Sequence, residues 1–321
     1  MIEQILNQNT SKTNKMKQLF ELGLTRKQVA KLLNVNYGFA HNVYVSIYGT
    51  RRNPRNLNQN SNDQLGAWKR TFGVEIEAYG VPVDIVLAKL REAGINVNAE
   101  SYNHIDRDYW KIVSDSSIQG TNSFELVSPP LRGEQGLEEL RKVCEVLVRV
   151  KAKVNKSCGL HVHFDARGYS LDSWKRLVYN YILMESEIDK MMPESRRGNN
   201  NRYCRSLSAQ YIMGLVLNKG LARRKIFECD SLESLSGELT YRSRYFKVNI
   251  ESYWRHKTVE FRQHSGTVEF EKISNWIRIL NRLMNFSEQN EFQNQDFNLL
   301  TGILSLNLIN YIKQRRAKFG F

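Results

Sequence analysis

FGVEIE, residues 72–77, is the stretch that indicates how the main part of the chain folds. Alternate side chains of a strand share one face, so its apolar residues would be buried while Glu75 and Glu77 lie together opposite. Their carboxylates would sit about 7 Å apart along the strand. Like charges on one sheet face repel each other unless a cation lies between them. The stretch therefore predicts a divalent-cation site; a solvated outer face is the alternative.

Two later runs repeat this pattern. In CGLHVHF, His161 and His163 share one predicted face and the apolar residues share the other. In TVEFRQH, Glu260, Arg262 and His264 are expected on one face. The histidines could bind a metal or phosphate, or be buried side chains with ordinary hydrogen bonds. Glu260 and Arg262 could be a structural ion pair, although Glu suits Mg²⁺ and Arg suits a transferring phosphoryl group.

A fourth run, WKIVSDSSIQGTNSFELVSPP, offers Asp115 in a turn and Glu125 on a strand. Together the four runs would place carboxylates, two histidines and an arginine on one sheet face. Such a group is costly unless cations are bound. It fits Mg²⁺ or Mn²⁺ bridging the phosphates of ATP.

The remaining pattern predicts an α+β fold. Six β-type runs alternate with helical stretches, which favours a curved, mostly antiparallel sheet with flanking helices. The sequence contains no internal repeat, no GxGxxG after a strand and no Walker loop. Helices are expected over residues 82–93, 133–151, 170–192, 206–217 and 269–286, and near the C-terminus.

The N-terminal region differs in character. Residues 13–22, 26–33 and 37–48 have helical spacing, with Thr25 as an expected N-cap, and resemble a helix-turn-helix. Residues 1–62 carry nine Lys or Arg against two Glu, half of the net charge of +14, which favours a polyanion such as DNA. A helical cap packed on the main domain or on a partner is the alternative. The expected DNA contacts are Arg26, Lys27, Asn36, Tyr37, His41, Asn42, Arg51 and Arg52.

These features divide the chain into a helix-turn-helix-like domain at 1–50, a basic polar linker at 51–67 and a main domain at 68–321. The four cysteines have no metal-knuckle spacing, which fits a reducing cytoplasm. No apolar stretch is long enough to span a bilayer, so no membrane association is expected.

In their order, FGVEIE, W…DSS, ELVSP, CGLHVH and TVEFRQHSGT resemble the amidoligases of the glutamine-synthetase and glutamate–cysteine ligase superfamily. The resemblance covers about Phe72 to the C-terminus. It implies a glutamine-synthetase-like sheet, ATP and Mg²⁺ (or Mn²⁺) as cofactors, and a carboxylate and an amine as substrates. The metal ligands that it implies are Glu75, Glu77, Glu125, His161 and Glu260.

The resemblance also implies further roles. Arg262 would steady the transferring phosphoryl group, His163 would lie near phosphate, and Asp115 would act in the catalytic turn. The family that this chain resembles usually has Asp-Gly-Ser where this chain has Asp115-Ser116-Ser117, and glycine would allow a positive φ that serine adopts less readily. Residues implied on the ATP or substrate side are Arg196, Arg197, Arg202, Asn249 and His264.

The activity implied is ATP-dependent formation of an amide through an acyl phosphate. Two other classes remain open: a DNA-binding regulator whose large domain senses nucleotide or metal, and a metal-dependent hydrolase. A guanidino kinase fits poorly, because such sites use several arginines and a reactive cysteine rather than carboxylates and histidines.

Overall fold

The protein is described here by a computed structural model that covers residues 2–22, 24–48, 64–101, 103 and 105–321. It consists of two compact units, residues 1–61 and 62–321. Most of the predicted linker lies outside the described residues. Residues 65–67 belong to the larger unit, because Asn285 Nδ2 donates to the carbonyls of Leu65 and Ala67, both at 2.8 Å.

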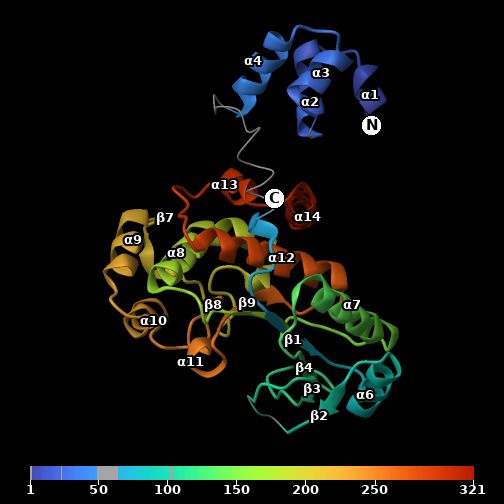
Figure 1. Cartoon of the computed structure of the whole chain (residues 1–321), viewed down its shortest axis with the longest axis vertical. Helices are drawn as coiled ribbons and strands as arrows, with labels where there is room; N and C mark the ends of the chain where they lie inside the picture. The colour runs from blue at the N-terminus through green and yellow to red at the C-terminus, as the bar shows by residue number, and fades with distance from the viewer. Residues whose placement is uncertain (1, 23, 49–63, 102, 104) are drawn as a thin grey trace. The chain divides into compact units, whose positions relative to one another are not determined.

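The N-terminal unit contains helices α1 (Ile2–Leu6), α2 (Lys12–Glu21), α3 (Arg26–Leu32) and α4 (Tyr37–Tyr48) around its own small core (Figure 1). Thr25 caps α3 as predicted, and Gln28 completes a capping box. Asn34 has a φ of 46° in the turn between α3 and α4. The three helices expected from the sequence are therefore present, and α1 is an addition.

The larger unit is built on a seven-stranded sheet in the order β2-β3-β4-β1-β5-β9-β8. Every pairing is antiparallel except β2 with β3. This confirms the mostly antiparallel sheet; the three-residue β2 was not predicted. The strands are β1 (Phe72–Ala78), β2 (Val97–Ala99), β3 (Trp110–Val113), β4 (Phe124–Val127), β5 (Gly159–Asp165), β8 (Val248–Asn249) and β9 (Thr258–Ser265).

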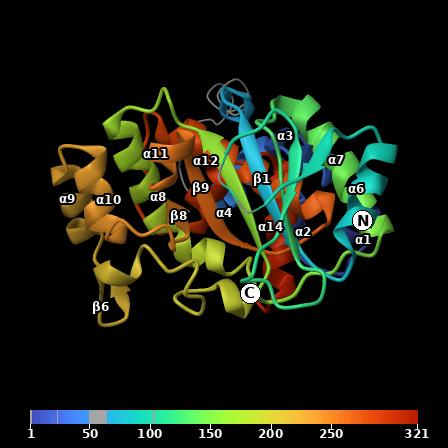
Figure 2. The same cartoon turned by 90° about the horizontal axis from the view of Figure 1, so that it is seen from below.

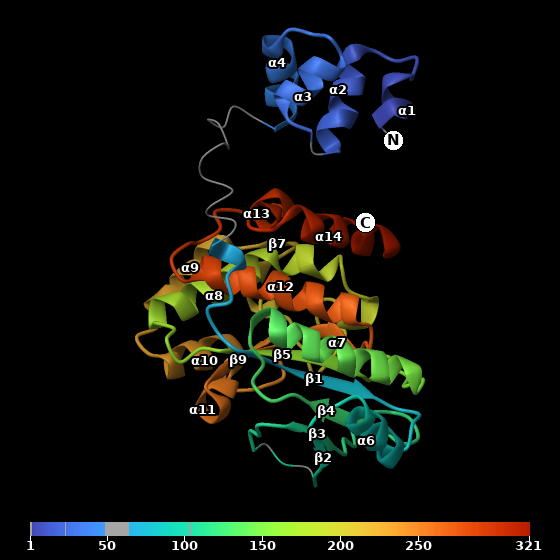
Figure 3. The same cartoon turned by 45° about the vertical axis from the view of Figure 1, so that its right-hand side comes forward.

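Long helices cover one face of this sheet. Figures 1 and 3 show α7 (Gly133–Arg149), α8 (Leu171–Asp189) and α12 (Phe270–Ser287) on that side, with α13 (Phe297–Gly302) and α14 (Leu306–Lys318) beyond them. The predicted apolar face of β1 is buried beneath them. Figure 2 looks toward the opposite face of the sheet. The predicted helix near residues 82–93 is α6 (Val83–Glu92).

The prediction of a helix at residues 206–217 is wrong. The segment forms a short 3-10 turn and a hairpin of β6 (Ile212–Met213) and β7 (Val216–Leu217). Gly214 adopts a φ of 64° between these strands, which a helix does not allow. Three helices that the sequence did not predict follow: α9 (Lys219–Glu228), α10 (Leu232–Thr240) and α11 (Ser252–His256).

The prediction that His264 shares a strand face with Glu260 and Arg262 is also wrong. β9 contains one extra residue, because Val162 pairs with Phe261 whereas Leu160 pairs with His264. Beyond this bulge the alternation reverses, so His264 is buried against Trp276 of α12. The bulge keeps Glu260 and Arg262 on the open face and removes His264 from it.

Among the described residues, no helix has the length and apolar character needed to cross a membrane.

Candidate functional site

A cavity of about 990 Å³ opens on the face of the sheet that the long helices leave uncovered. Strand register sets its floor. Glu75 of β1 pairs with His161 of β5, and Glu77 pairs with Glu125 of β4. Glu260 of β9 pairs with His163. Four separate runs of sequence therefore meet in one cavity, as their alternation predicted.

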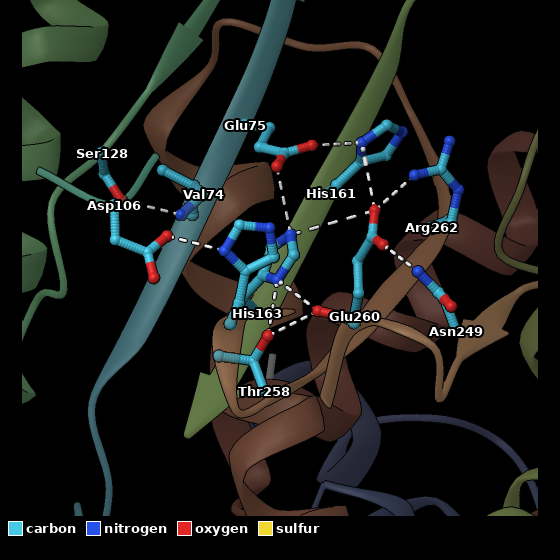
Figure 4. A network of polar contacts seen from close by, with 12 residues as sticks. Val74, Glu75, Asp106, Ser128, His161, His163, Asn249, Thr258, Glu260 and Arg262 are labelled. Carbon is cyan, nitrogen blue, oxygen red and sulfur yellow. Dashed lines mark hydrogen bonds and ion pairs between the residues drawn. The ribbon is translucent and has the colours of Figure 1, made fainter. Parts of the chain in front are cut away.

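Glu75, His161 and Glu260 form the first group of possible metal ligands. Their ligand atoms lie within 4.8 Å of one another. His161 Nδ1 is 2.8 Å from Glu75 Oε2 and 3.4 Å from Glu260 Oε1 (Figure 4). Oxygen-rich sets of this kind suit hard divalent cations.

The second group is Glu77, Glu125 and His161, and all three residues are buried. His161 Nε2 lies 3.6 Å from Glu77 Oε1. The Gly159 amide donates to Glu77 Oε2 at 2.6 Å and fixes this carboxylate. If His161 donates from Nδ1 to Glu75, its Nε2 lone pair faces the second group, the usual arrangement of a metal-binding imidazole.

The ionisable groups of the floor perturb one another. Burial raises the pKa of Glu125 well above its usual value, and the charges of Glu75 and Glu77 raise it further. Burial alone would raise the pKa of Glu75, but His163 and His161 bring it well below its usual value. The pKa of His163 is raised, because Glu75 outweighs the opposing effect of burial. The floor thus holds more negative charge than its own histidines neutralise.

Arg262 lies beside the first group. Its guanidinium pairs with Glu260 Oε1, and its Nε donates to the Tyr203 carbonyl at 3.3 Å. Glu260 Oε2 also accepts a hydrogen bond from Asn249 Nδ2 at 2.5 Å. Asn249 lines the cavity, and its buried Oδ1 atom has no hydrogen-bond partner among the described residues. An acceptor left in this way is available to a cation or to a ligand N–H or O–H group.

Several contacts fix the position of the His163 ring. Its Nδ1 lies 2.9 Å from Thr258 Oγ1 and its Nε2 lies 3.2 Å from Glu75 Oε1. The ring packs edge-on against His256 of α11, whose Nδ1 is 2.7 Å from Asp106 Oδ1. Figure 4 shows this chain of contacts from Asp106 to Glu260.

Asp115 and Arg196 also line the cavity. Asp115 Oδ1 accepts a hydrogen bond from the Ser117 amide at 2.7 Å, which closes the turn. Ser116 is not among the described residues with positive φ, so the turn forms without the glycine conformation that we expected it to need.

Three predicted ATP- or substrate-side residues lie outside the cavity lining. Arg197 donates to the Met192 carbonyl and packs on the rings of Phe319 and Phe321. Arg202 is exposed and stacks on Tyr203. His264 lies on the helix-covered face, where burial lowers its pKa to about 3.

Several lining residues were not singled out from the sequence. They come from loops and from α11, where no periodicity marks which side chain points inward. A cluster of Arg and aromatic residues near 244–255 was the available signal. These residues are Tyr203, Arg244, Tyr245, Trp254, Arg255 and His256.

The predicted DNA contacts are unevenly exposed. Arg26 is buried, lies over the Tyr44 ring and has Nη1 2.7 Å from His41 Nδ1. This interior position differs from the expected outward one, because the guanidinium packs between α3 and α4. Asn36 Oδ1 accepts from the Gly38 amide at 2.7 Å at the start of α4. Lys27, Tyr37 and Asn42 are exposed, while Arg51 and Arg52 lie outside the described residues.

Comparisons with known proteins identify the family of this chain. None of the curated proteins compared matches the sequence. Among solved structures, a bifunctional glutathione synthetase from Pasteurella multocida is similar, with a TM-score of 0.41 and 13% identity over 80% of this chain and 48% of that one. This chain thus spans about half of that protein's length. The family described as "Putative amidoligase enzyme" matches residues 68–284, which include every strand of the large sheet. The chain therefore belongs to the amidoligase family.

Proposed function

We propose that the larger unit is an ATP-dependent carboxylate–amine ligase with a glutamine-synthetase-like sheet, acting through an acyl phosphate. One observation carries this proposal: two groups of metal-ligand side chains share one cavity with a buried arginine. Family membership supports the same class of reaction. The identities of the carboxylate and the amine are left to experiment.

The donor set fits two divalent cations, Mg²⁺ or Mn²⁺. Four glutamates and one histidine supply the ligands, and the unpartnered Asn249 Oδ1 adds a further oxygen. The raised pKa of Glu125 reflects burial and repulsion from Glu75 and Glu77, which bound cations would relieve. Cations bound here would neutralise phosphate charge and orient ATP.

Individual residues of the chain would act in the two steps of the proposed reaction. In the first step a substrate carboxylate oxygen attacks the γ-phosphorus, the bond to the β–γ bridging oxygen breaks, and ADP leaves. Arg262, fixed by Glu260 and the Tyr203 carbonyl, would stabilise the charge on the phosphoryl oxygens. In the second step the amine attacks the acyl carbon, phosphate leaves and the nitrogen loses a proton. Asp115 and His163 line the same cavity and would help to orient these groups.

The test is formation of ADP and phosphate from ATP with Mg²⁺ and pools of amino acids and amines, with mass spectrometry of the products. Wild-type protein should consume ATP in proportion to a new amide, whereas Glu75→Gln should not. Glu92→Gln is the matched control, because Glu92 is exposed on α6 and pairs only with Lys89 among the described residues. Hydrolysis of a substrate without ATP would instead support the alternative of a metal-dependent hydrolase. Absence of ATP turnover together with tight DNA binding would support the alternative of a DNA-binding regulator.

We further infer that the N-terminal unit tethers the enzyme to DNA through α3 and α4. The exposed Lys27, Lys31, Tyr37 and Asn42 on these helices support this inference, as does the positive charge of the segment. Retention on DNA should fall steeply with salt if it depends on phosphate contacts. Salt-independent retention, or no retention at low salt, would argue for a protein partner instead.

A further inference from the structure

Arg196 is a buried charge in the lining of the cavity. Its residue is 3% exposed, and none of the ion pairs among the described residues involves it. Its Nη2 donates to the Cys158 carbonyl at 2.5 Å, and its Nη1 makes only a long contact of 3.7 Å to Cys204 Sγ. Its Nε has no hydrogen-bond partner in the described part of the chain. A buried guanidinium without a carboxylate is costly unless a ligand supplies the negative charge.

Arg196 also lies close to one of the two groups of metal ligands. A Cβ added to Gly159 would be 2.9 Å from His161 Nε2 and 3.5 Å from Arg196 Nη1. The imidazole and the guanidinium therefore converge over this glycine. His161 Nε2 faces Glu77 and Glu125, so Arg196 borders that second group and Arg262 borders the first.

The two arginines differ in what they can bind. Arg262 is already paired with Glu260, so an incoming anion would share it. Arg196 has no acidic partner among the described side chains, and a planar guanidinium matches a carboxylate in geometry. Its neighbour His264 has a pKa lowered by burial and by nearby cationic groups that include Arg196, so it adds no competing charge at neutral pH.

We propose that Arg196 binds the carboxylate that is to be activated, holding it between the guanidinium and the Glu77–Glu125–His161 group. This inference rests on the proposed ligase function and assigns the carboxylate side of the cavity. ATP would then lie toward Arg262 and Asn249. Arg196 is a substrate-binding residue in this assignment, and it discriminates against ligands that lack an anionic group.

The experiment measures ligand binding to the full-length protein by calorimetry. The probes are Mg²⁺ with the non-hydrolysable analogue AMP-PCP, and then acetate, glutarate and L-glutamate added to that complex. Arg196→Gln should weaken binding of the carboxylates by about 10- to 100-fold, the usual loss for a hydrogen bond to a charged group. It should leave binding of Mg²⁺–AMP-PCP unchanged. Arg196→Lys should recover part of the loss, because lysine restores the positive charge but not the paired N–H donors of the planar guanidinium.

Two controls separate binding from structure. Arg223→Gln makes the same change in charge at a half-exposed arginine that pairs with Glu291. It should change neither the affinity for the carboxylates nor the affinity for Mg²⁺–AMP-PCP. The melting temperature of Arg196→Gln without ligands should equal or exceed that of wild type, because an uncompensated buried charge is removed. A clear fall in melting temperature with unchanged carboxylate affinity would overturn the proposal in favour of a structural role.

The remaining outcomes are also decisive. Loss of AMP-PCP binding by Arg196→Gln, with carboxylate binding retained, would make Arg196 a phosphate ligand and overturn this assignment while leaving the ligase proposal intact. Wild-type protein that binds the nucleotide but none of the carboxylates in large excess would overturn it too. Wild-type protein that binds neither Mg²⁺ nor AMP-PCP would overturn the ligase proposal itself.

Discussion

Glu125→Gln should stabilise the cation-free protein and weaken its response to Mg²⁺. Glu125 is buried on β4, at one side of the acidic floor, and the charges of Glu75 and Glu77 add to burial in raising its pKa. A carboxyl whose folded-state pKa exceeds its unfolded value destabilises the fold increasingly as pH rises above the unfolded value. Glutamine has nearly the same shape and carries no charge.

The structure sets the size of the effect. The ligand atoms of Glu77, Glu125 and His161 lie within 4.8 Å of one another. Two unit charges at 4.8 Å repel by about 3.5 kcal/mol at an effective dielectric constant of about 20. Partial protonation of Glu125 relieves some of this repulsion, so we expect a gain of roughly 1–3 kcal/mol at pH 7. The gain should vanish as pH falls toward about 4.5, the usual value for glutamate.

Added Mg²⁺ should narrow or reverse this difference in stability. Saturation at about 100 times the dissociation constant stabilises a protein by about 2.7 kcal/mol. For a unit of this size, this corresponds to roughly 5–10 °C in melting temperature. Wild type should show this increase, and Glu125→Gln should show much less of it.

The assay is thermal unfolding with EDTA or with Mg²⁺, at pH 7 and near pH 4.5. Glu92→Gln, at an exposed helical position, should behave as wild type within about 0.5 kcal/mol. The reasoning is refuted if Glu125→Gln is less stable than wild type in EDTA at pH 7. It is refuted equally if both proteins gain the same stability from Mg²⁺.

Three shorter predictions test other parts of the molecule. Gly159→Ala would place a Cβ 2.9 Å from His161 Nε2, so Mg²⁺-dependent stabilisation and ATP turnover should fall at least tenfold while circular dichroism stays native. Deletion of residues 1–61 should leave ATP turnover intact and abolish salt-sensitive DNA retention, because each unit has its own core. Lys247→Met should cost about 3–5 kcal/mol in urea unfolding, because it leaves the buried Glu185 and the partly buried Asp189 without their cation; an unchanged midpoint would contradict this.

Strand alternation predicted the floor of the cavity well, for a physical reason. A strand with one buried apolar face fixes the direction of every other side chain. Glu75, His161 and Glu260 were therefore placed on a common face before their distances were known. The same rule failed at His264, because an inserted residue reverses the alternation and nothing in TVEFRQH marks its position.

The walls of the cavity were harder to predict. Tyr203 and Tyr245 are positioned by backbone hydrogen bonds between distant segments, such as that from the Arg205 amide to the Tyr245 carbonyl at 2.9 Å. Pairings of this kind follow from tertiary packing and leave no periodic trace in the sequence. Sequence reasoning left Arg196 and Arg197 equivalent, and the structure separates them by directing only Arg196 into the cavity.

The acidic floor itself favours a cation-dependent activity over a purely structural role. In a structural ion pair each carboxylate is bonded to a cationic side chain, as Glu185 and Asp189 both are to Lys247. The floor instead joins Glu77 and Glu125 around a histidine, without a Lys or Arg bonded to either carboxylate among the described residues. Such an excess of buried negative charge lowers stability until cations bind. Because Arg196 lies beside the same group and forms no ion pair among the described residues, a cation and an anionic substrate would complete the site together.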